Sequence, residues 1–136
     1  MNSTVSGSSV VPLVGRVLIA ALFLVAGFGK IMGFAGTAGY MAKLGFPAPE
    51  VMTAISTLIE AGGGILLIIG WKTRWVAWGL AIFVVIATLA AHRFWEIPDA
   101  AQMIGQRTHF LKNLAIIGGL LFVAAFGPGS ISVDKH

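Results

Sequence analysis

Long apolar runs separated by short polar segments dominate the chain. Four of these runs are each about 20 residues long, the length with which an α-helix crosses roughly 30 Å of hydrocarbon. They predict spans at residues 12–31, 50–70, 75–95 and 109–127, within a single domain at 12–127. A flexible N-terminal tail is predicted at residues 1–11 and a C-terminal tail at 128–136. The predicted fold class is therefore all-α, an integral-membrane four-helix bundle.

The segments between the spans carry interfacial patterns. Residues 32–50 are amphipathic and rich in Gly, which favours a loop at the membrane interface with a short helix around 35–44. Pro49 suits the first turn of the helix that follows. Residues 71–75 place two Trp around Lys72 and Arg74, a pattern typical of an interface anchor.

Composition supports a membrane protein and narrows its partners. Hydrophobic residues make up 57% of the chain and charged residues only 10%, well below the roughly 25% usual in soluble domains. The net charge of +4 is spread over helix ends and does not form one basic face, so we expect lipid head groups and no nucleic acid as partners. There is no Cys, which excludes a disulfide, a thiol relay and a Cys-ligated metal.

An even number of spans predicts that both termini lie on one side of the membrane. That side also holds the loop with Lys72 and Arg74, together with Lys135, whereas Lys43 and Arg107 lie opposite. The excess of cations favours cytoplasmic termini by the positive-inside rule.

Glu60 is the most informative polar residue, because it interrupts the second apolar run near its middle. A carboxylate near the bilayer centre costs roughly 2.5–3.5 kcal/mol on insertion scales, so it is expected to have a partner or a function. The candidate cationic partners near the other helix ends are Arg16, Lys30, His92, Arg93, His109 and Lys112.

Helical spacing predicts that several of these residues face the interior of the bundle. His109, Lys112 and Asn113 share one stripe of the fourth span, and Arg16 and Lys30 share one stripe of the first. The loops after the first and third spans lie on the same membrane face, which would place Lys30, His92 and His109 near one another. A polar funnel leading from that face to Glu60, roughly 15 Å deep at 1.5 Å per residue, is therefore predicted.

Each of these residues also has a structural interpretation. Arg16 and Lys30 suit cations that extend from helix ends to the head groups. Glu60 could be a structural acid paired with a Lys or Arg of another helix, and Asn113 could form an interhelical hydrogen bond. The Gly-rich segments at 62–64 and 118–119 are typical of close helix packing.

The order and spacing of several motifs resemble the DoxX family of small four-helix bacterial inner-membrane proteins, over about residues 12–126. The motifs are Gly15-Arg16, Phe23-Leu-Val-Ala-Gly-Phe-Gly-Lys30, Gly45-Phe-Pro-Ala-Pro49, Glu60 with its trailing glycines, His92 with Phe94-Trp95, and His109-Phe-Leu-Lys-Asn113. The resemblance implies a multi-pass protein of the bacterial inner membrane. It also implies a link to redox chemistry, because some relatives belong to a thiosulfate:quinone oxidoreductase or to a complex associated with oxidative stress.

The first functional hypothesis is a redox-associated subunit that interacts with quinone or quinol. Glu60, His92, His109 and Lys112 would move protons and position the ring, and Arg16, Lys30 and Asn113 would help to bind it. Electrons would come from a partner enzyme, which would make the chain a subunit of a quinone-linked oxidoreductase. We expect neither haem nor a metal.

Two further hypotheses remain open. In the second hypothesis the chain catalyses no reaction and acts as a membrane scaffold or accessory subunit that docks a soluble oxidoreductase, with residues 32–50 as the contact surface. The last hypothesis is a small proton-coupled transporter, which four spans would favour only in a homo-oligomer packed through the Gly-rich faces.

Overall fold

The computed structural model describes residues 7–134, and most of them are helical. Within this range four helices are long and apolar enough to cross a membrane. The elements are α1 (Gly7–Met32), α2 (Phe34–Lys43), α3 (Pro49–Ile69), α4 (Thr73–Ala91), the 3₁₀ turn η1 (Phe94–Glu96) and α5 (Ala100–Phe126). The prediction of an all-α protein with four membrane spans is confirmed.

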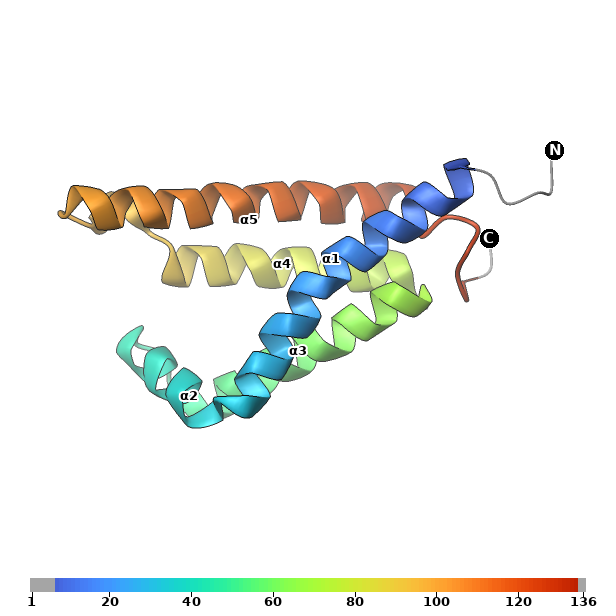
Figure 1. Ribbon diagram of the computed structural model, residues 1–136. Helices are drawn as coiled ribbons and strands as arrows, with labels where there is room; N and C mark the ends of the chain where they lie inside the picture. The colour runs from blue at the N-terminus through green and yellow to red at the C-terminus, as the bar shows by residue number, and fades with distance from the viewer. Residues whose placement is uncertain (1–6, 135–136) are drawn as a thin grey trace.

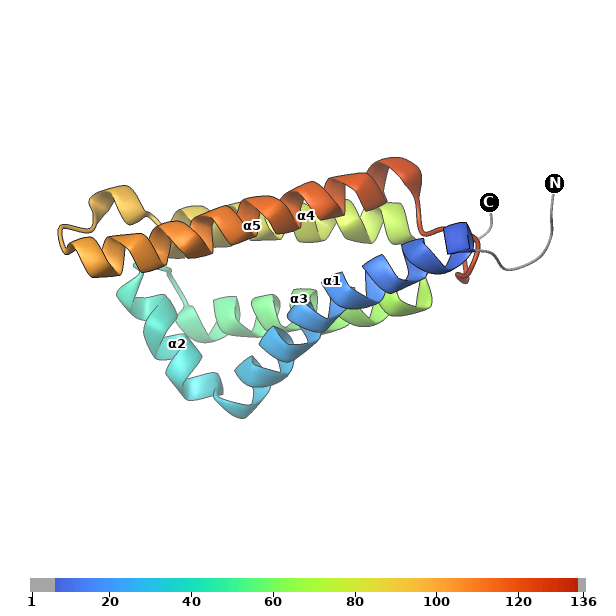
Figure 2. The same cartoon turned by 45° about the horizontal axis from the view of Figure 1, so that its top comes forward.

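The long helices form two pairs, α1 with α3 and α4 with α5, and α3 joins the pairs by also contacting α4. Figure 2 shows that the pairs lie close together at the end where α1 begins and separate toward the other end, where α2 is found. The start of α1, the turn between α3 and α4 and the C-terminal segment lie at one end of the bundle (Figure 1). This arrangement follows from the even number of spans.

The interior of the bundle is built mainly from small and medium-sized side chains. Its buried cluster contains Ala20, Phe23, Leu67, Ala77, Leu80, Ala81, Val84, Leu120 and Ala124. Large apolar side chains such as Val25, Leu58 and Phe126 are instead more than 70% exposed. Lipid is as apolar as these side chains, so the membrane removes the penalty for exposing them and leaves close packing to hold the helices together.

Glycine allows α1 and α3 to approach closely. A Cβ atom on Gly27 would lie 2.8 Å from the backbone nitrogen of Ala61, a distance that real Cβ atoms do not show. On α3, a Cβ on Gly64 would meet the side chain of Leu24 at 2.9 Å, and one on Gly63 would meet Leu80 of α4 at 2.8 Å. Gly63 and Gly64 are thus packing residues, as one interpretation of the sequence held, whereas a Cβ on Gly62 would meet nothing within 4 Å.

The C-terminal segment is docked against the bundle. The amides of Val133 and Asp134 donate to the carbonyls of Ile69 and Gly70 at the end of α3. The carboxylate of Asp134 then accepts hydrogen bonds from the amides of Lys72 and Thr73 at the start of α4. A residue 61 to 62 positions away in sequence therefore caps α4, whose N-cap residue Lys72 makes no side-chain cap hydrogen bond.

Several predicted boundaries differ from the structure. Helix α1 already begins at Gly7, so residues 7–11 are not a tail, and residues 1–6 lie outside the described range. Helix α4 ends at Ala91, earlier than predicted. The fourth span was expected to start at 109, but α5 begins at Ala100, because Asp99 caps it by accepting from the amide of Gln102. The predicted short helix around 35–44 is confirmed as α2.

Candidate functional site

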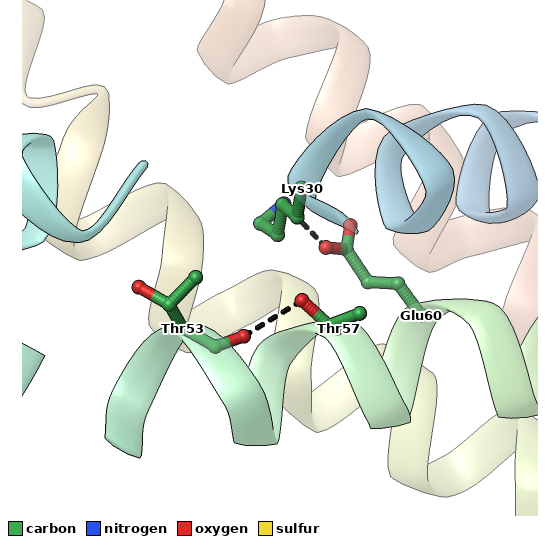
Figure 3. Close-up of polar contacts among 4 residues, drawn as sticks. All are labelled: Lys30, Thr53, Thr57 and Glu60. Carbon is green, nitrogen blue, oxygen red and sulfur yellow. Dashed lines mark hydrogen bonds and ion pairs between the residues drawn. The ribbon is translucent and has the colours of Figure 1, made fainter. Parts of the chain in front are cut away.

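Lys30 and Glu60 form an ion pair between α1 and α3 (Figure 3), in which the Lys30 ammonium donates to Oε1 of Glu60. Glu60 lies eleven residues after Pro49, the first residue of α3, which places it about 16 Å along the helix at 1.5 Å per residue. Only 8% of the Glu60 side chain and 21% of the Lys30 side chain are exposed. Of the cationic partners considered from the sequence, Lys30 is the one that contacts Glu60.

Two threonines near Glu60 satisfy their hydroxyl groups within α3 itself. Thr57 donates to the carbonyl of Thr53 at 2.8 Å (Figure 3), and Thr53 donates to the carbonyl of Pro49 at 2.8 Å. These bonds leave the ion pair between Lys30 and Glu60 as the interhelical polar contact of this region.

A cavity of about 490 Å³ adjoins the ion pair. Its walls come from α1, α2, the segment between α2 and α3, α3 and α4, and α5 contributes none of the lining residues. The lining residues are Ala26, Gly29, Lys30, Thr37, Tyr40, Met41, Leu44, Phe46, Met52, Ile55, Ser56, Ile59, Glu60, Phe83, Ile86, Ala87, Ala90 and Ala91. The cavity is therefore a largely apolar chamber with one ion pair in its wall.

The cavity is open toward the outer surface of the bundle. Ile55 of α3 and Ile86 of α4 both line it, and about half of each side chain is exposed. Tyr40 of α2 lines it as well and is 46% exposed. Because α3 and α4 are candidate membrane spans, the exposed parts of Ile55 and Ile86 would border lipid.

His92 and His109 come together outside the cavity lining. Their rings are stacked with centroids 5.1 Å apart, and Nδ1 of His92 lies 2.6 Å from Oε1 of Gln106. Phe94, Trp95 and Phe110 form an aromatic cluster beside them. Neither histidine lines the cavity. The predicted polar funnel is thus divided into two groups, one at Glu60 and one at the junction of α4 and α5.

Lys112 and Asn113, the other two residues of α5 that the sequence predicted for the site, also lie outside the cavity lining. Asn113 donates from Nδ2 to the hydroxyl of Thr88 on α4 at 2.8 Å, and that hydroxyl in turn donates to the carbonyl of Val84. This bond joins two helices, as the structural interpretation of Asn113 expected. Lys112 is exposed on α5.

Arg16 lies at the opposite end of the bundle from the cavity. It is 1% exposed, and its Nη2 atom donates to the carbonyl of Ile131 in the docked C-terminal segment. Its Nε and Nη1 atoms are buried without a hydrogen-bond partner among the described residues. The structure therefore separates Arg16 from Lys30, although both lie on the inner stripe of α1.

Sequence reasoning did not identify four polar residues that the structure brings to these groups. Thr37, Tyr40 and Ser56 line the cavity, and Gln106 contacts His92. Ser56 precedes Glu60 by four residues, so the i, i+4 spacing was a signal that places it on the same face of α3. Gln106 precedes His109 by three residues, so the i, i+3 spacing was also a signal, but Gln106 lay outside the predicted fourth span. Tyr40 lies in a segment without such a signal.

Comparison with known proteins gives the family. The family model described as DoxX matches residues 11–93. The inner membrane protein YphA of Escherichia coli K12 is 37% identical over 126 residues, which cover 91% of this chain and 88% of YphA. YqjF, a second inner membrane protein of that strain, is 38% identical over 123 residues, covering 90% of this chain and 88% of YqjF.

A more distant relative is much longer. The Surfeit locus protein 4 homolog of Drosophila melanogaster is 33% identical over 88 residues, which cover 64% of this chain and 33% of that protein. No solved structure matches the chain. The family model spans more than half of the sequence and contains all residues that line the cavity. The chain therefore belongs to the DoxX family and is an inner-membrane protein, like its two Escherichia coli relatives.

Proposed function

We propose that this DoxX-family protein binds a quinone or quinol in the cavity beside Lys30 and Glu60. The observation that supports this proposal best is an apolar chamber within the membrane-spanning region that is open toward lipid and has one ion pair in its wall. Ligand sites typically combine 300–1,000 Å³ of mainly apolar space with a few polar groups that orient the ligand. The cavity meets both criteria.

The residues present fit a quinone head group. The Lys30 ammonium can donate a hydrogen bond to a carbonyl oxygen, and the Glu60 carboxylate can accept one from a hydroxyl group. Phe83 and Met52 supply apolar walls for the ring, and the opening at Ile55 and Ile86 leads an isoprenoid tail into the bilayer. When bound, a quinone supplies a carrier for two electrons and two protons.

The chain's own contribution is to bind and orient the head group and to hold a proton at Glu60. Electrons would come from a partner oxidoreductase, so the protein would act as the membrane subunit of a redox system. His92, His109 and Lys112 lie outside the cavity lining, so their proposed role is to contact the soluble partner at the membrane face and not to bind the ring. Arg16 and Asn113 would support the bundle and not the ligand.

The test is mass spectrometry of lipid-soluble molecules that co-purify with the detergent-extracted protein. Stoichiometric quinone is expected with the wild type. It should be lost from Glu60→Gln, which removes the negative charge and so the ion pair with Lys30, and from Ala87→Phe, which fills the cavity without changing the ion pair. Glu96→Gln is the matched control, because it removes an acid paired with Arg93 on the surface.

Folding of each variant is checked by its helical circular dichroism and thermal unfolding. Quinone that persists in a folded Ala87→Phe variant would place the binding site elsewhere. A wild type without quinone would contradict the proposal and favour the scaffold hypothesis, for which capture of a partner by the purified protein is the next measurement.

A further inference from the structure

We propose that the Lys30–Glu60 pair restricts the cavity to lipid-soluble molecules with an uncharged head group and excludes anionic amphiphiles. This inference rests on the proposed role of the cavity as a ligand site and specifies the class of ligand. It concerns charge selection alone, and it therefore applies whether or not the natural ligand is a quinone.

The charge balance of the cavity is the first argument. Among the lining residues in the described part of the chain, Lys30 and Glu60 carry the only charged side chains. Their charges cancel, and both are largely removed from solvent. An anionic head group placed here would compete with Glu60 for Lys30 and leave one negative charge without a partner in a medium of low dielectric constant.

The surrounding cations do not compensate for such a charge. Lys43 at the end of α2, Arg93 after α4 and Lys112 on α5 are all exposed, and none of them lines the cavity. Arg16 is buried at the other end of the bundle. An anion in the cavity would thus depend on Lys30 alone, which Glu60 already occupies.

An uncharged head group meets no such penalty. A carbonyl oxygen can accept from Lys30, and a hydroxyl group can donate to Glu60, while the pair itself stays intact. The apolar walls then accept an alkyl chain or a ring. The class of ligand is a neutral amphiphile with a carbonyl or hydroxyl group at one end.

The test compares two probes that differ only in head group, tritiated hexadecanol and tritiated hexadecyl sulfonate, which stays ionised at neutral pH. Binding is measured with the full chain in nanodiscs of zwitterionic lipid. The wild type should bind the alcohol and not the sulfonate. Glu60→Gln frees Lys30 and should gain affinity for the sulfonate by about tenfold or more, because an unpaired buried cation strongly favours an anion.

Two variants show whether the gain arises in the cavity. Glu96→Gln frees Arg93, an exposed cation outside the cavity, and should gain no sulfonate binding. Lys30→Met combined with Glu60→Gln removes both charges and should abolish the gain. Equal sulfonate binding by the wild type and Glu60→Gln, both folded by circular dichroism, would overturn the inference.

The result is separable from the proposed function. A wild type that carries no quinone, with a Glu60→Gln variant that gains sulfonate binding, would refute the quinone proposal and support charge selection. A wild type that binds quinone and sulfonate equally well would support the quinone proposal and refute charge selection.

Discussion

Arg16 donates a hydrogen bond from Nη2 to the carbonyl of Ile131, although 115 positions separate the two residues. The bond connects the first helix to the C-terminal segment, whose Asp134 caps α4. A guanidinium that is 1% exposed thus holds together three parts of the chain that meet at one end of the bundle.

Replacement of Arg16 by Met should release the C-terminal segment. The Ile131 carbonyl would lose its donor, at a cost of about 1–3 kcal/mol. Hydrogen exchange at the amides of Val133 and Asp134, which are bonded to the end of α3, should accelerate roughly tenfold or more. Arg74→Met is the matched control, since exposed Arg74 donates to the carbonyl of Ala125 at the same end. Unchanged exchange in a folded Arg16→Met variant would show that the segment docks without this bond.

Loss of Lys30 alone should destabilise the protein more than loss of both members of the pair. Lys30→Met leaves the Glu60 carboxylate without a partner, which should lower the free energy of unfolding by about 3 kcal/mol. The double variant Lys30→Met/Glu60→Leu removes the buried charge and should recover most of that stability. Unfolding in detergent measures each value, and a double variant no more stable than Lys30→Met would contradict the ion-pair argument.

Gly27→Ala should weaken the contact between α1 and α3. The added Cβ would lie 2.8 Å from the backbone nitrogen of Ala61, so the helices must separate, at a cost of about 1–3 kcal/mol. Gly15→Ala on the same helix is the control, because its Cβ meets nothing within 4 Å. Thermal unfolding distinguishes the two, with a lower midpoint expected only for Gly27→Ala.

His109→Phe should leave ligand binding by the cavity unchanged. His109 stacks on His92 outside the cavity lining, and Phe keeps a ring of similar shape in that position. Its expected effect is on the activity of a complex with a partner, while co-purified quinone stays within about twofold of the wild type. Loss of quinone from this variant would show that His109 takes part in quinone binding.

The four spans could be predicted from the sequence because the thickness of the bilayer fixes the length of each apolar run. The start of α5 could not be predicted in this way, because hydropathy reports only the part of a helix that lies in lipid. Residues 100–108 extend α5 on the N-terminal side of the apolar run, and Asp99 caps this extension. The short helix α2 was recognisable because its amphipathic composition differs from that of the spans on either side.

The pair of Lys30 and Glu60 was within reach of sequence reasoning, since few ionisable residues interrupt the apolar runs. The separation of His92 and His109 from Glu60 could not be predicted from the sequence. Helical spacing gives the inward face of each helix but does not state which helices are neighbours. Helix α5 packs mainly on α4, whereas Glu60 faces α1.

The absence of α5 from the cavity lining divides the described bundle into two parts that can change independently. The lining runs from Ala26 to Ala91, within the residues matched by the family model, and all of α5 lies beyond that match. Substitutions on the outer face of α5 therefore leave the walls of the chamber intact. The last helix of this chain can therefore vary in sequence on its outer face while the shape and charge of the cavity stay the same.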